Sequence, residues 1–533
     1  MGSRLPWRPH SPDASPIRYE GNGTRVRNQV QLITYAERLG ANLGDTIETV
    51  KTVFAGACGG VHLLPFFDAF DGADAGFDPI DHTRVDPRLG SWSDVRALAS
   101  THDVVVDVIV NHVSSQSKEF LDFREYGENS EFADMFLTFD TVFPHGATAR
   151  DLTAIYRPRP GLPFTSMLIG GERRLVWTTF TADQIDIDVS SEPGARYLAR
   201  VLDQLAASGV TMVRLDAAGY AVKKAGSSCF LEPEAFEFID EFTAEAHARG
   251  LEVLVEVHSY FQRQVEIAVR VDWVYDFALA PLVLHALTAG DADPLGRWLA
   301  TRPTNAITVL DTHDGIGVVD VGPSSGDDGG AGLLTPHQID ALVQGIHGRT
   351  GGQSRSATGQ GASNVDIYQV NSTFYSALGC DDAAYLAARC LQFFVPGVPQ
   401  VYYVGALAGA NDMALFANTG VGRDINRHHF TRSEIDERAT SPVVESLLAL
   451  MRFRNEHPAF AGRAKIDHSR AHIAIDWWRG GHWARVRLDT HTRRVRLSWT
   501  TASGDVVEAD DLLSLSATLQ WGRVAGSKEP VSV

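Results

Sequence analysis

Short apolar runs alternate with amphipathic segments along most of this chain. Two of the amphipathic segments, Ala195–Ala207 and Ala235–Arg249, repeat their apolar residues with helical spacing. The apolar runs have the length of buried strands, and eight of them are Gln31–Tyr35, Gly60–Pro65, Val104–Asn111, Met212–Asp216, Val253–Val257, Trp273–Phe277, Ile307–Asp311 and Gln400–Val404. Strands that alternate with helices pair in parallel through right-handed crossovers. Eight such units predict an α/β protein built on a (β/α)8 TIM barrel.

Two connections between these runs are too long for simple crossovers and predict inserted domains. The first follows the third run and is rich in Pro, Gly and aromatic residues, and the second follows the seventh run. From about Arg463 the apolar residues alternate with period two, which predicts an antiparallel β domain. The expected organisation is a disordered N-terminal extension (1–27), three barrel parts (28–111, 191–315 and 380–460), two inserted domains (112–190 and 316–379) and a C-terminal β domain (461–533).

Three acidic residues stand at or near the ends of apolar runs. Asp216 ends the fourth run, Glu256 lies near the end of the fifth, and Asp314 follows the seventh. A carboxylate at the end of a buried strand needs a task or a partner, because burying a charge is costly. The carboxyl ends of parallel barrel strands meet on one face, where barrel enzymes carry their active sites. We therefore expect the three carboxylates to share one pocket.

The neighbours of these carboxylates suggest different tasks for them. Arg214 and Asp216 lie two residues apart on one strand, and a guanidinium favours the ionised carboxylate that a nucleophile needs. Glu256 ends a run of Leu and Val, and an apolar surrounding raises a carboxyl pKa, which suits a general acid. Retaining glycosidases need such a pair about 5 Å apart. For each residue alone, a structural ion pair is the alternative, and for His313 and Asp314 a capped turn.

Two further positions belong to the same face of the predicted barrel. His112 follows the third run, and Asp74 and Phe77 lie in the loop after the second. A lone histidine is more often a hydrogen-bonded core residue, but its place at this face favours a role in the pocket. A carboxylate and an aromatic ring suit the hydroxyls and the apolar face of a sugar, whereas the alternative is a plain Asp/Gly/Pro turn.

The composition excludes several classes of partner. The chain has 47 basic and 66 acidic residues and a formal net charge of −19, which disfavours nucleic acid and anionic membranes. The first 26 residues contain no apolar stretch long enough for a signal peptide, and no run in the chain approaches the length of a membrane span. Four cysteines without a C-x-x-C pair are typical of free thiols, so we expect a cytoplasmic protein. The absence of P-loop, dinucleotide and paired-histidine motifs predicts no cofactor and no metal.

The residues singled out above belong to four longer motifs: Asp107-Val-Ile-Val-Asn-His112, Met212-Val-Arg-Leu-Asp216, Leu254-Val-Glu256-Val-His258 and Val309-Leu-Asp-Thr-His313-Asp314. These motifs resemble those of the α-amylase superfamily of retaining α-glycosidases, glycoside hydrolase family 13. Within that superfamily the chain is similar to the sucrose phosphorylase branch from Asn28 to about Phe460. The segments that carry this closer resemblance are Ala73–Thr83, Tyr156–Phe164, Asp366–Thr373, Gln400–Gly405 and Gly422–Arg427.

The resemblance implies a role for each matching residue. Asp216 would be the nucleophile, Glu256 the acid/base, and Asp314 the carboxylate that stabilises the transition state. The glucosyl unit would be held by Asp74, His112, Arg214, His313 and Arg423, with Phe77 as a hydrophobic platform beneath it and Gln184 close to the acceptor. Fructose and phosphate would alternate in a site lined by Arg159, His258, Asp366, Tyr368 and Gln369.

The reaction implied by this resemblance is the retaining phosphorolysis of sucrose through a β-glucosyl–Asp216 intermediate. The partners would be sucrose, inorganic phosphate, α-D-glucose 1-phosphate and fructose, and the resemblance also implies a homodimer. Sibling enzymes act on sucrose 6′-phosphate, glucosylglycerol or glucosylglycerate, but the stretch Ile367-Tyr368-Gln369 adds no Lys or His for a fructose phosphate. A retaining α-glucosidase or transglucosidase and, more remotely, a non-catalytic sugar-binding protein are the alternatives.

Overall fold

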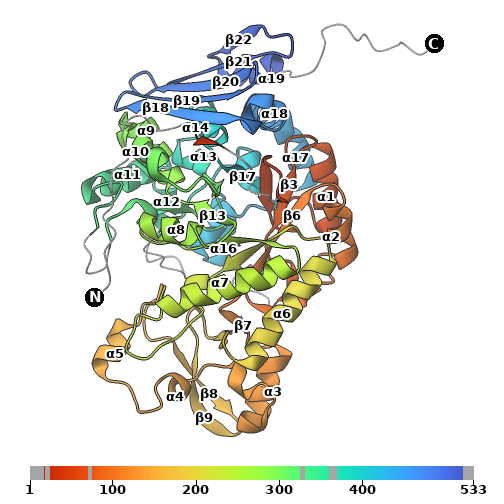
Figure 1. Cartoon of the computed structure of the whole chain (residues 1–533), viewed down its shortest axis with the longest axis vertical. Coiled ribbons are helices and arrows are strands. Elements are labelled where there is room, and N and C mark those ends of the chain that lie inside the picture. The colour runs from red at the N-terminus through yellow and green to blue at the C-terminus, as the bar shows by residue number, and fades with distance from the viewer. Residues whose placement is uncertain (1–16, 19–24, 70–74, 325–329, 359–368, 520–533) are drawn as a thin grey trace, which may run out of the picture.

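Eight parallel strands close into a barrel at the centre of the molecule (Figure 1). The computed structural model describes residues 17–18, 25–69, 75–324, 330–358 and 369–519. In their order around the barrel, the strands are β2 (Gln31–Thr34), β3 (Gly60–Leu63), β6 (Asp103–Ile109), β11 (Met212–Asp216), β12 (Glu252–Val255), β13 (Trp273–Asp276), β14 (Ala306–Thr308) and β17 (Val398–Tyr402). Each predicted run contributes one strand, which confirms the (β/α)8 barrel.

Helices pack around the outside of the barrel because each has one apolar face. In α6 (Glu192–Ala207) the buried residues include Tyr197, Val201 and Leu205, and the Ser191 side chain accepts a hydrogen bond from the Gly194 N–H at the helix start. The other long helices that flank the strands are α1 (Leu43–Thr52), α2 (Trp92–Ala99), α7 (Pro233–Ala248), α8 (Phe261–Ala268), α9 (Leu279–Ala289), α10 (Asp293–Thr301), α14 (Asp382–Phe394) and α18 (Pro442–Glu456).

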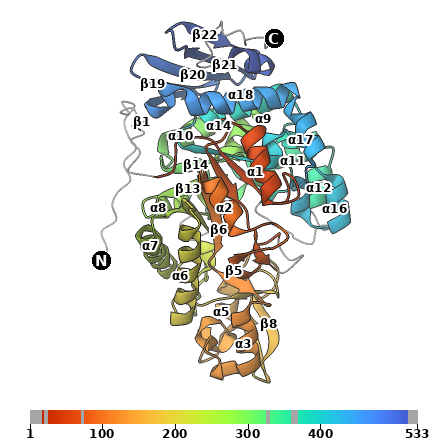
Figure 2. The same ribbon diagram turned by 90° about the vertical axis from the view of Figure 1, so that its right-hand side faces the viewer.

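The first insertion lies at one end of the molecule, opposite the C-terminal sheet (Figures 1 and 2). It contains β7 (His112–Ser114), α3 (Lys118–Tyr126), α4 (Phe139–Val142), α5 (Ala149–Ala154), β8 (Phe164–Ile169), β9 (Glu172–Trp177) and β10 (Gln184–Asp186). Strand β10 pairs antiparallel with β7, with Asp186 opposite His112 and Gln184 opposite Ser114. This pairing brings both ends of the insertion back to the end of β6.

The second insertion follows β14 and packs on the same end of the barrel strands. It contains β15 (Ile316–Gly317), η4 (Val319–Val321), α11 (Pro336–Arg349), α12 (Gln353–Thr358), β16 (Gln369–Val370) and α13 (Phe374–Ala377). Strands β15 and β16 form a two-residue antiparallel pair in which Gly317 lies opposite Gln369. Between β17 and α18 the chain adds α15 (Tyr403–Ala406), α16 (Met413–Thr419), η5 (Gly422–Asn426) and α17 (Arg432–Ala439).

The C-terminal part forms the predicted antiparallel sheet. Its strands are β18 (Arg463–Ser469), β19 (His472–Arg479), β20 (His482–Asp489), β21 (Arg494–Thr500) and β22 (Val506–Ala509), and α19 (Leu515–Thr518) follows. Along β20 buried and more exposed residues alternate, as a sheet with one covered face requires. A sixth strand, β1 (Ile17–Arg18), pairs antiparallel with β18.

The predicted disorder up to residue 27 is wrong for the last residues of that segment. Val26 is buried, and its backbone N–H donates to Glu252 Oε1 at 3.3 Å. The backbone N–H of Arg27 donates to Asp103 Oδ2 at 2.7 Å. Glu252 and Asp103 begin β12 and β6, so their carboxylates at the amino-terminal face of the barrel hold this stretch of chain. A sequence pattern does not show such a tertiary pairing.

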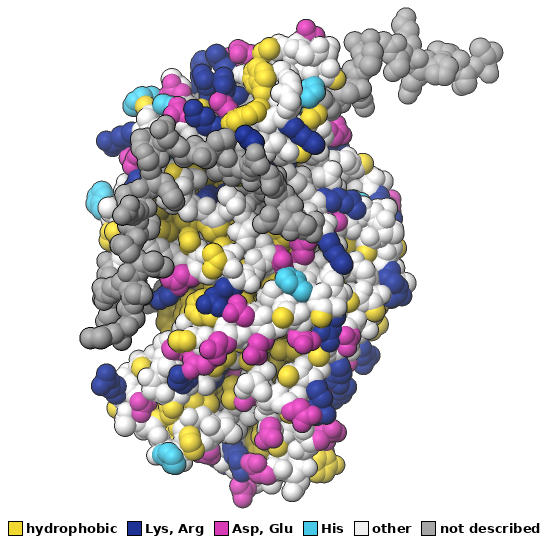
Figure 3. Space-filling view, viewed as in Figure 1, with side chains coloured by type: hydrophobic (Ala, Val, Ile, Leu, Met, Phe, Trp, Pro, Cys, Tyr) yellow, Lys and Arg dark blue, Asp and Glu magenta, His cyan; other side chains and the backbone are white. Residues whose placement is uncertain are grey.

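The surface mixes charged and apolar side chains (Figure 3), and the cysteines are free. On the face shown in Figure 3, acidic and basic side chains are interspersed with hydrophobic ones. All four cysteines lie among the described residues, and none of them forms a disulfide bond. Within the described ranges, no helix has both the length and the apolar character needed to cross a membrane.

Candidate active site

A pocket opens at the carboxyl ends of the barrel strands, where the two insertions meet the barrel. It gathers most of the residues that the sequence predicted: Phe77, His112, Arg159, Gln184, Asp216, Glu256, His258, His313, Asp314, Gln369 and Arg423. Arg214 lies against Asp216 and Glu256 and lines a smaller cavity together with Glu256 and His313. Asp74, Asp366 and Tyr368 lie outside the described residues.

Arg214 is a buried guanidinium that contacts three carboxylates. Its Nη1 lies 3.3 Å from Asp216 Oδ1 and also donates to Asp107, while its Nη2 lies 2.7 Å from Glu256 Oε1. Asp107 and Arg214 are paired in register on neighbouring strands β6 and β11. The pairing of the two strands is therefore enough to bring the Arg214 guanidinium to Asp107, without any contribution from a loop.

Asp107 is a residue of this network to which sequence reasoning assigned no role. It is fully buried, and His62 Nε2 lies 3.1 Å from its Oδ2. Burial would raise the pKa of Asp107, but Arg214 and His62, which both hydrogen-bond to it, outweigh burial and lower that pKa to about 2. An ionised Asp107 keeps the Arg214 fork in place. The signal in the sequence is a carboxylate inside the otherwise apolar run Val104–Val110.

Asp216 and Glu256 hydrogen-bond to each other. Burial and the neighbouring charge of Glu256 raise the pKa of Asp216 well above its ordinary value, and Arg214 opposes this only in part. Arg214 contacts Asp216 as predicted, but the predicted apolar surroundings of Glu256 are wrong. Glu256 is not in an apolar site, because it contacts both Arg214 and His258, and the Arg214 charge is not reserved for Asp216.

Asp314 is held by one cation, Arg423, and lies beside the His313 ring. Arg423 Nη1 lies 2.8 Å from its Oδ1, and His313 Nε2 lies 3.5 Å from its Oδ2. Burial would raise the pKa of Asp314, but Arg423 and His313 outweigh burial, so this pKa lies well below its ordinary range. Burial lowers the pKa of His313 itself, so the ring is neutral around pH 7. Asp314 is therefore an ionised hydrogen-bond acceptor.

The floor of the pocket is made of rings and of a shared carbonyl. Phe77 stacks on His313 with ring centroids 4.9 Å apart and an interplanar angle of 8°. His112 Nε2 lies 2.8 Å from the carbonyl oxygen of Phe77, and Gln184 Nε2 donates to the same oxygen at 3.0 Å. The β7–β10 pairing of the first insertion thus fixes the loop that carries Phe77.

An aromatic wall on one side of the pocket was missed by sequence reasoning. Tyr220 packs on Phe230 and on Phe180, with ring centroids 4.6 and 5.2 Å apart, and Tyr156 packs on Phe230 at 4.6 Å. These residues come from the first insertion and from the loop after β11. Their separation along the chain hides the cluster, although Tyr156 starts one of the segments that carried the family resemblance.

Beneath this wall a buried lysine joins the first insertion to the barrel. Lys223 Nζ lies 2.7 Å from Asp186 Oδ2 and donates to Asn111 Oδ1 at 2.6 Å and to the carbonyl oxygen of Tyr220. Asp186 also accepts from Asn111 Nδ2 at 3.1 Å. One ammonium therefore ties the end of β6, the end of β10 and the loop after β11 together, and this loop supports the aromatic wall.

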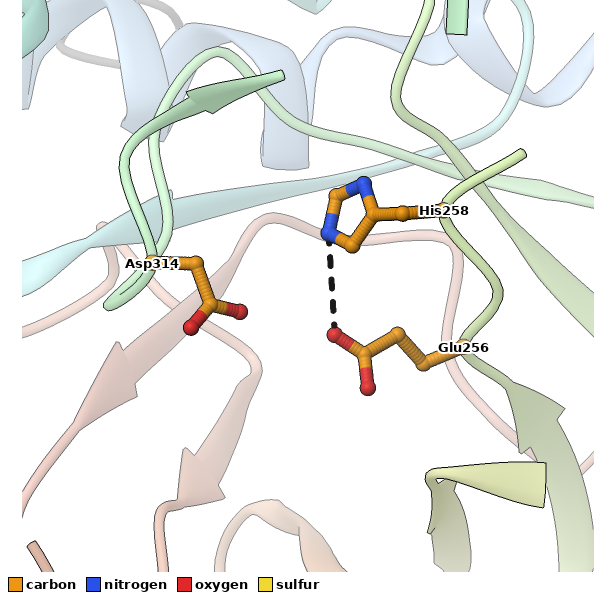
Figure 4. A group of neighbouring side chains, drawn as sticks. All are labelled: Glu256, His258 and Asp314. Atoms are coloured by element: carbon orange, nitrogen blue, oxygen red, sulfur yellow. Dashed lines mark ion pairs between the residues drawn. The ribbon is translucent and has the colours of Figure 1, made fainter. Parts of the chain in front are cut away.

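Glu256, His258 and Asp314 come from two loops and point toward one another (Figure 4). The nearest ligand-type atoms of the three residues lie within 4.8 Å of one another, a spacing that a metal ion would accept. However, Glu256 contacts Arg214 and Asp314 contacts Arg423. A dication would face repulsion from both guanidinium groups at short range. The donor set suits a ligand with hydroxyl groups or negative charge better than a metal.

A parallel eight-stranded barrel with paired carboxylates at its carboxyl face is typical of a barrel enzyme that cleaves glycosidic bonds. Residues 56–269 match the alpha amylase catalytic domain. The chain is 53% identical to the sucrose phosphorylase of Bifidobacterium adolescentis over 92% of its own length and 99% of that protein. It is 58% identical to the sucrose phosphorylase of Agrobacterium vitis, covering 83% and 90% of the two chains.

A solved structure agrees with these sequence matches. The sucrose 6F-phosphate phosphorylase from Thermoanaerobacter thermosaccharolyticum superposes with a TM-score of 0.85 at 39% identity, covering 93% of this chain and all of that one. The chain belongs to the sucrose phosphorylase family within the α-amylase superfamily.

Proposed function

We propose that this enzyme cleaves sucrose with inorganic phosphate and releases α-D-glucose 1-phosphate and fructose with retained configuration. The observation that carries the proposal is the hydrogen-bonded pair of Asp216 and Glu256, held by Arg214, with the cationic His258 beside Glu256. The pair supports a double displacement, and a cation beside it supports an anionic second substrate. The membership in the sucrose phosphorylase family supports the same substrates.

In the first step Asp216 is the nucleophile. One of its carboxylate oxygens bonds to the anomeric carbon of the glucosyl unit, and the bond from that carbon to the fructose oxygen breaks. The electron pair of that bond goes to the fructose oxygen, which takes the proton of Glu256. Asp314, kept ionised by Arg423, accepts hydrogen bonds from sugar hydroxyls as positive charge develops on the ring. The product is a β-glucosyl ester of Asp216.

The second step reverses the roles with phosphate in place of fructose. A phosphate oxygen attacks the anomeric carbon, Glu256 takes the phosphate proton, and Asp216 leaves as a carboxylate. Two inversions return the original configuration. Arg159 and His258 offset the repulsion between phosphate and the carboxylates, and Gln369 lines the same pocket. Asp366 and Tyr368, proposed for the same subsite, belong to the part of the chain outside the described residues.

The hydrogen-bonded arrangement of Asp216 and Glu256 matches what this cycle needs. A double displacement requires one proton on the pair, carried by Glu256 when the donor is bound. In the free enzyme the raised pKa of Asp216 favours retention of a proton by this residue. A glucosyl unit that separates the two carboxyl groups removes their hydrogen bond and leaves the proton for Glu256 to donate.

The test is product analysis with and without phosphate. With sucrose and phosphate we expect glucose 1-phosphate and fructose in equal amounts, whereas free glucose alone would identify a hydrolase. Sucrose 6′-phosphate and glucosylglycerol, offered with phosphate, should react much more slowly than sucrose. A faster reaction with either donor would reassign the acceptor specificity and leave the double displacement in place. The homodimer stays a prediction, which light scattering on the purified enzyme tests.

A further inference from the structure

Asp320 is a buried carboxylate outside the proposed catalytic set. It belongs to η4 of the second insertion and is fully buried. Its Oδ2 lies 3.1 Å from His258 Nδ1, and its Oδ1 accepts from Gln264 Nε2 at 3.1 Å and from the Ser259 N–H at 3.3 Å. A buried carboxylate is stabilised by such donors. The Asp320 carboxylate therefore lies directly behind the imidazole of His258.

Asp320 sets the orientation of the His258 ring. An acceptor at Nδ1 fixes the proton on that nitrogen and turns Nε2 toward the pocket, where it lies 3.7 Å from Glu256 Oε1. The ring also stacks on Phe277, with centroids 3.9 Å apart. Among the described residues His258 Nε2 has no hydrogen-bond partner. Asp320 thus holds one edge of the His258 ring and Phe277 holds one face, while Nε2 is directed into the pocket beside Glu256.

The charges around His258 favour its protonated form. Burial alone would lower the pKa of this imidazole, but Asp320, Glu256 and Asp314 outweigh burial and raise that pKa from 6.5 to about 9. The cations that share the site contact other groups: Arg214 contacts Glu256, and Arg423 contacts Asp314. Arg159 lines the same pocket. Asp320 is the carboxylate of this set that lies closest to the ring.

Gly317 packs against the contact between Asp320 and His258. A Cβ at Gly317 in β15 would meet Asp320 Oδ2 at 2.6 Å and His258 Nδ1 at 3.4 Å. Gly317 also lies opposite Gln369, which lines the pocket. The absence of a side chain at this position lets β15 pass over the Asp320–His258 contact. The second insertion therefore carries both Asp320, which holds His258, and Gln369, which lines the pocket.

We propose that Asp320 is a positioning residue that acts through His258 and decides the competition between phosphate and water for the glucosyl enzyme. The inference rests on the proposed function. A protonated His258 attracts phosphate, whereas water carries no charge to attract, so removing the charge of Asp320 weakens one acceptor and spares the other. The effect has a pH limit. His258 is charged below about pH 9, so the advantage of phosphate is present there and is lost as the pH rises through that value.

The experiment compares Asp320→Asn with Asp340→Asn in the full-length enzyme. Asp340 is exposed on α11 of the same insertion, so both variants lose one carboxylate but only one touches His258. In Asp320→Asn we expect the KM for phosphate to rise roughly 10- to 100-fold, the loss of one charge-assisted hydrogen bond. The ratio of glucose 1-phosphate to glucose should fall, and the KM for sucrose should stay near the wild-type value. Its phosphorolysis should decline at a lower pH than that of the wild type.

Two further variants separate positioning from simple damage to the fold. Gly317→Ala should raise the KM for phosphate in the same direction, because its Cβ displaces the Asp320 carboxylate without changing the net charge. In a His258→Gln background, Asp320→Asn should have no further effect on the KM for phosphate. Equal rises in the KM for sucrose and for phosphate, or an Asp320→Asn enzyme that matches Asp340→Asn, would overturn the proposal.

A direct measurement of the imidazole keeps this inference distinct from the proposed function. Titration of histidine-labelled enzyme by NMR should give a pKa for His258 near 9 in the wild type and a clearly lower pKa in Asp320→Asn. If the wild type released no glucose 1-phosphate, the proposed function would fail, yet this titration would still decide whether Asp320 holds His258 as a cation. An unchanged pKa in Asp320→Asn would refute the positioning role whatever the reaction is.

Discussion

Arg214 Nη2 lies 2.7 Å from Glu256 Oε1, so the buried guanidinium touches the proposed acid/base as well as the proposed nucleophile. Its Nη1 lies 3.3 Å from Asp216 Oδ1. One cation therefore acts on both members of a hydrogen-bonded carboxyl pair. Arg214 limits the upward shift in the pKa of Asp216, and the planar fork reaches two acceptors at once.

Arg214→Lys should move the acidic limb of the activity profile to higher pH. An ammonium reaches fewer of the three carboxylates than the fork does, so the pKa of Asp216 rises further. Activity that needs an ionised nucleophile is present above this pKa and lost as the pH falls through it. We expect kcat for sucrose phosphorolysis to fall roughly 100-fold at pH 7 and less at higher pH. A pH profile that keeps its wild-type shape would contradict this account.

Asp216→Asn and Glu256→Gln should differ in their response to an activated donor. Both should lose activity on sucrose, Glu256→Gln by roughly 10²- to 10⁴-fold. α-Glucosyl fluoride has a leaving group that needs no proton, so it should restore formation of the glucosyl ester in Glu256→Gln but not in Asp216→Asn. Mass spectrometry of the trapped ester and the initial burst of fluoride measure this step. Rescue of both variants to the same degree would contradict the assigned roles.

Arg423→Gln should weaken the binding of the glucosyl unit more than that of phosphate. Arg423 lies 2.8 Å from Asp314 and lowers its pKa, so the variant has an Asp314 that protonates at a higher pH. We expect kcat/KM for sucrose to fall roughly 10- to 100-fold, most strongly in acid, as an ionised acceptor is lost. Arg432→Gln, a change at an exposed arginine of α17, is the matched control and should behave as wild type.

Lys223→Met should destabilise the junction between the barrel and the first insertion. It leaves the buried Asp186 without its cation, which costs about 3 kcal/mol in the free energy of unfolding. Lys224→Met is the control, because Lys224 is exposed and pairs with Glu234 at the surface. The melting temperature of the Lys224→Met variant should therefore match that of the wild type. Faster proteolysis within residues 112–190 of Lys223→Met would locate the effect. Equal melting temperatures of the two variants would show that the Lys223 contacts add no net stability.

The pattern of the chain predicted the barrel because its elements are local. Apolar runs of strand length separated by amphipathic helices are visible residue by residue, and each of the eight became a barrel strand. Since parallel strands present their carboxyl ends on one face, the convergence of Asp216, Glu256 and Asp314 also followed from the sequence. The ordered structure of the residues around Val26 could not be predicted in this way, because their hydrogen-bond partners Glu252 and Asp103 are distant in the chain.

By itself the sequence determined the barrel, the place of the three carboxylates and the family motifs, all of which depend on strand periodicity and short spacings. Only the tertiary structure decided how charge is shared among them. Arg214 faces Glu256 as well as Asp216, Asp320 stands behind His258, and Lys223 joins the first insertion to the barrel. These pairings form between segments far apart in the chain. Electrostatic interactions depend on distance and burial in space, which no local pattern encodes.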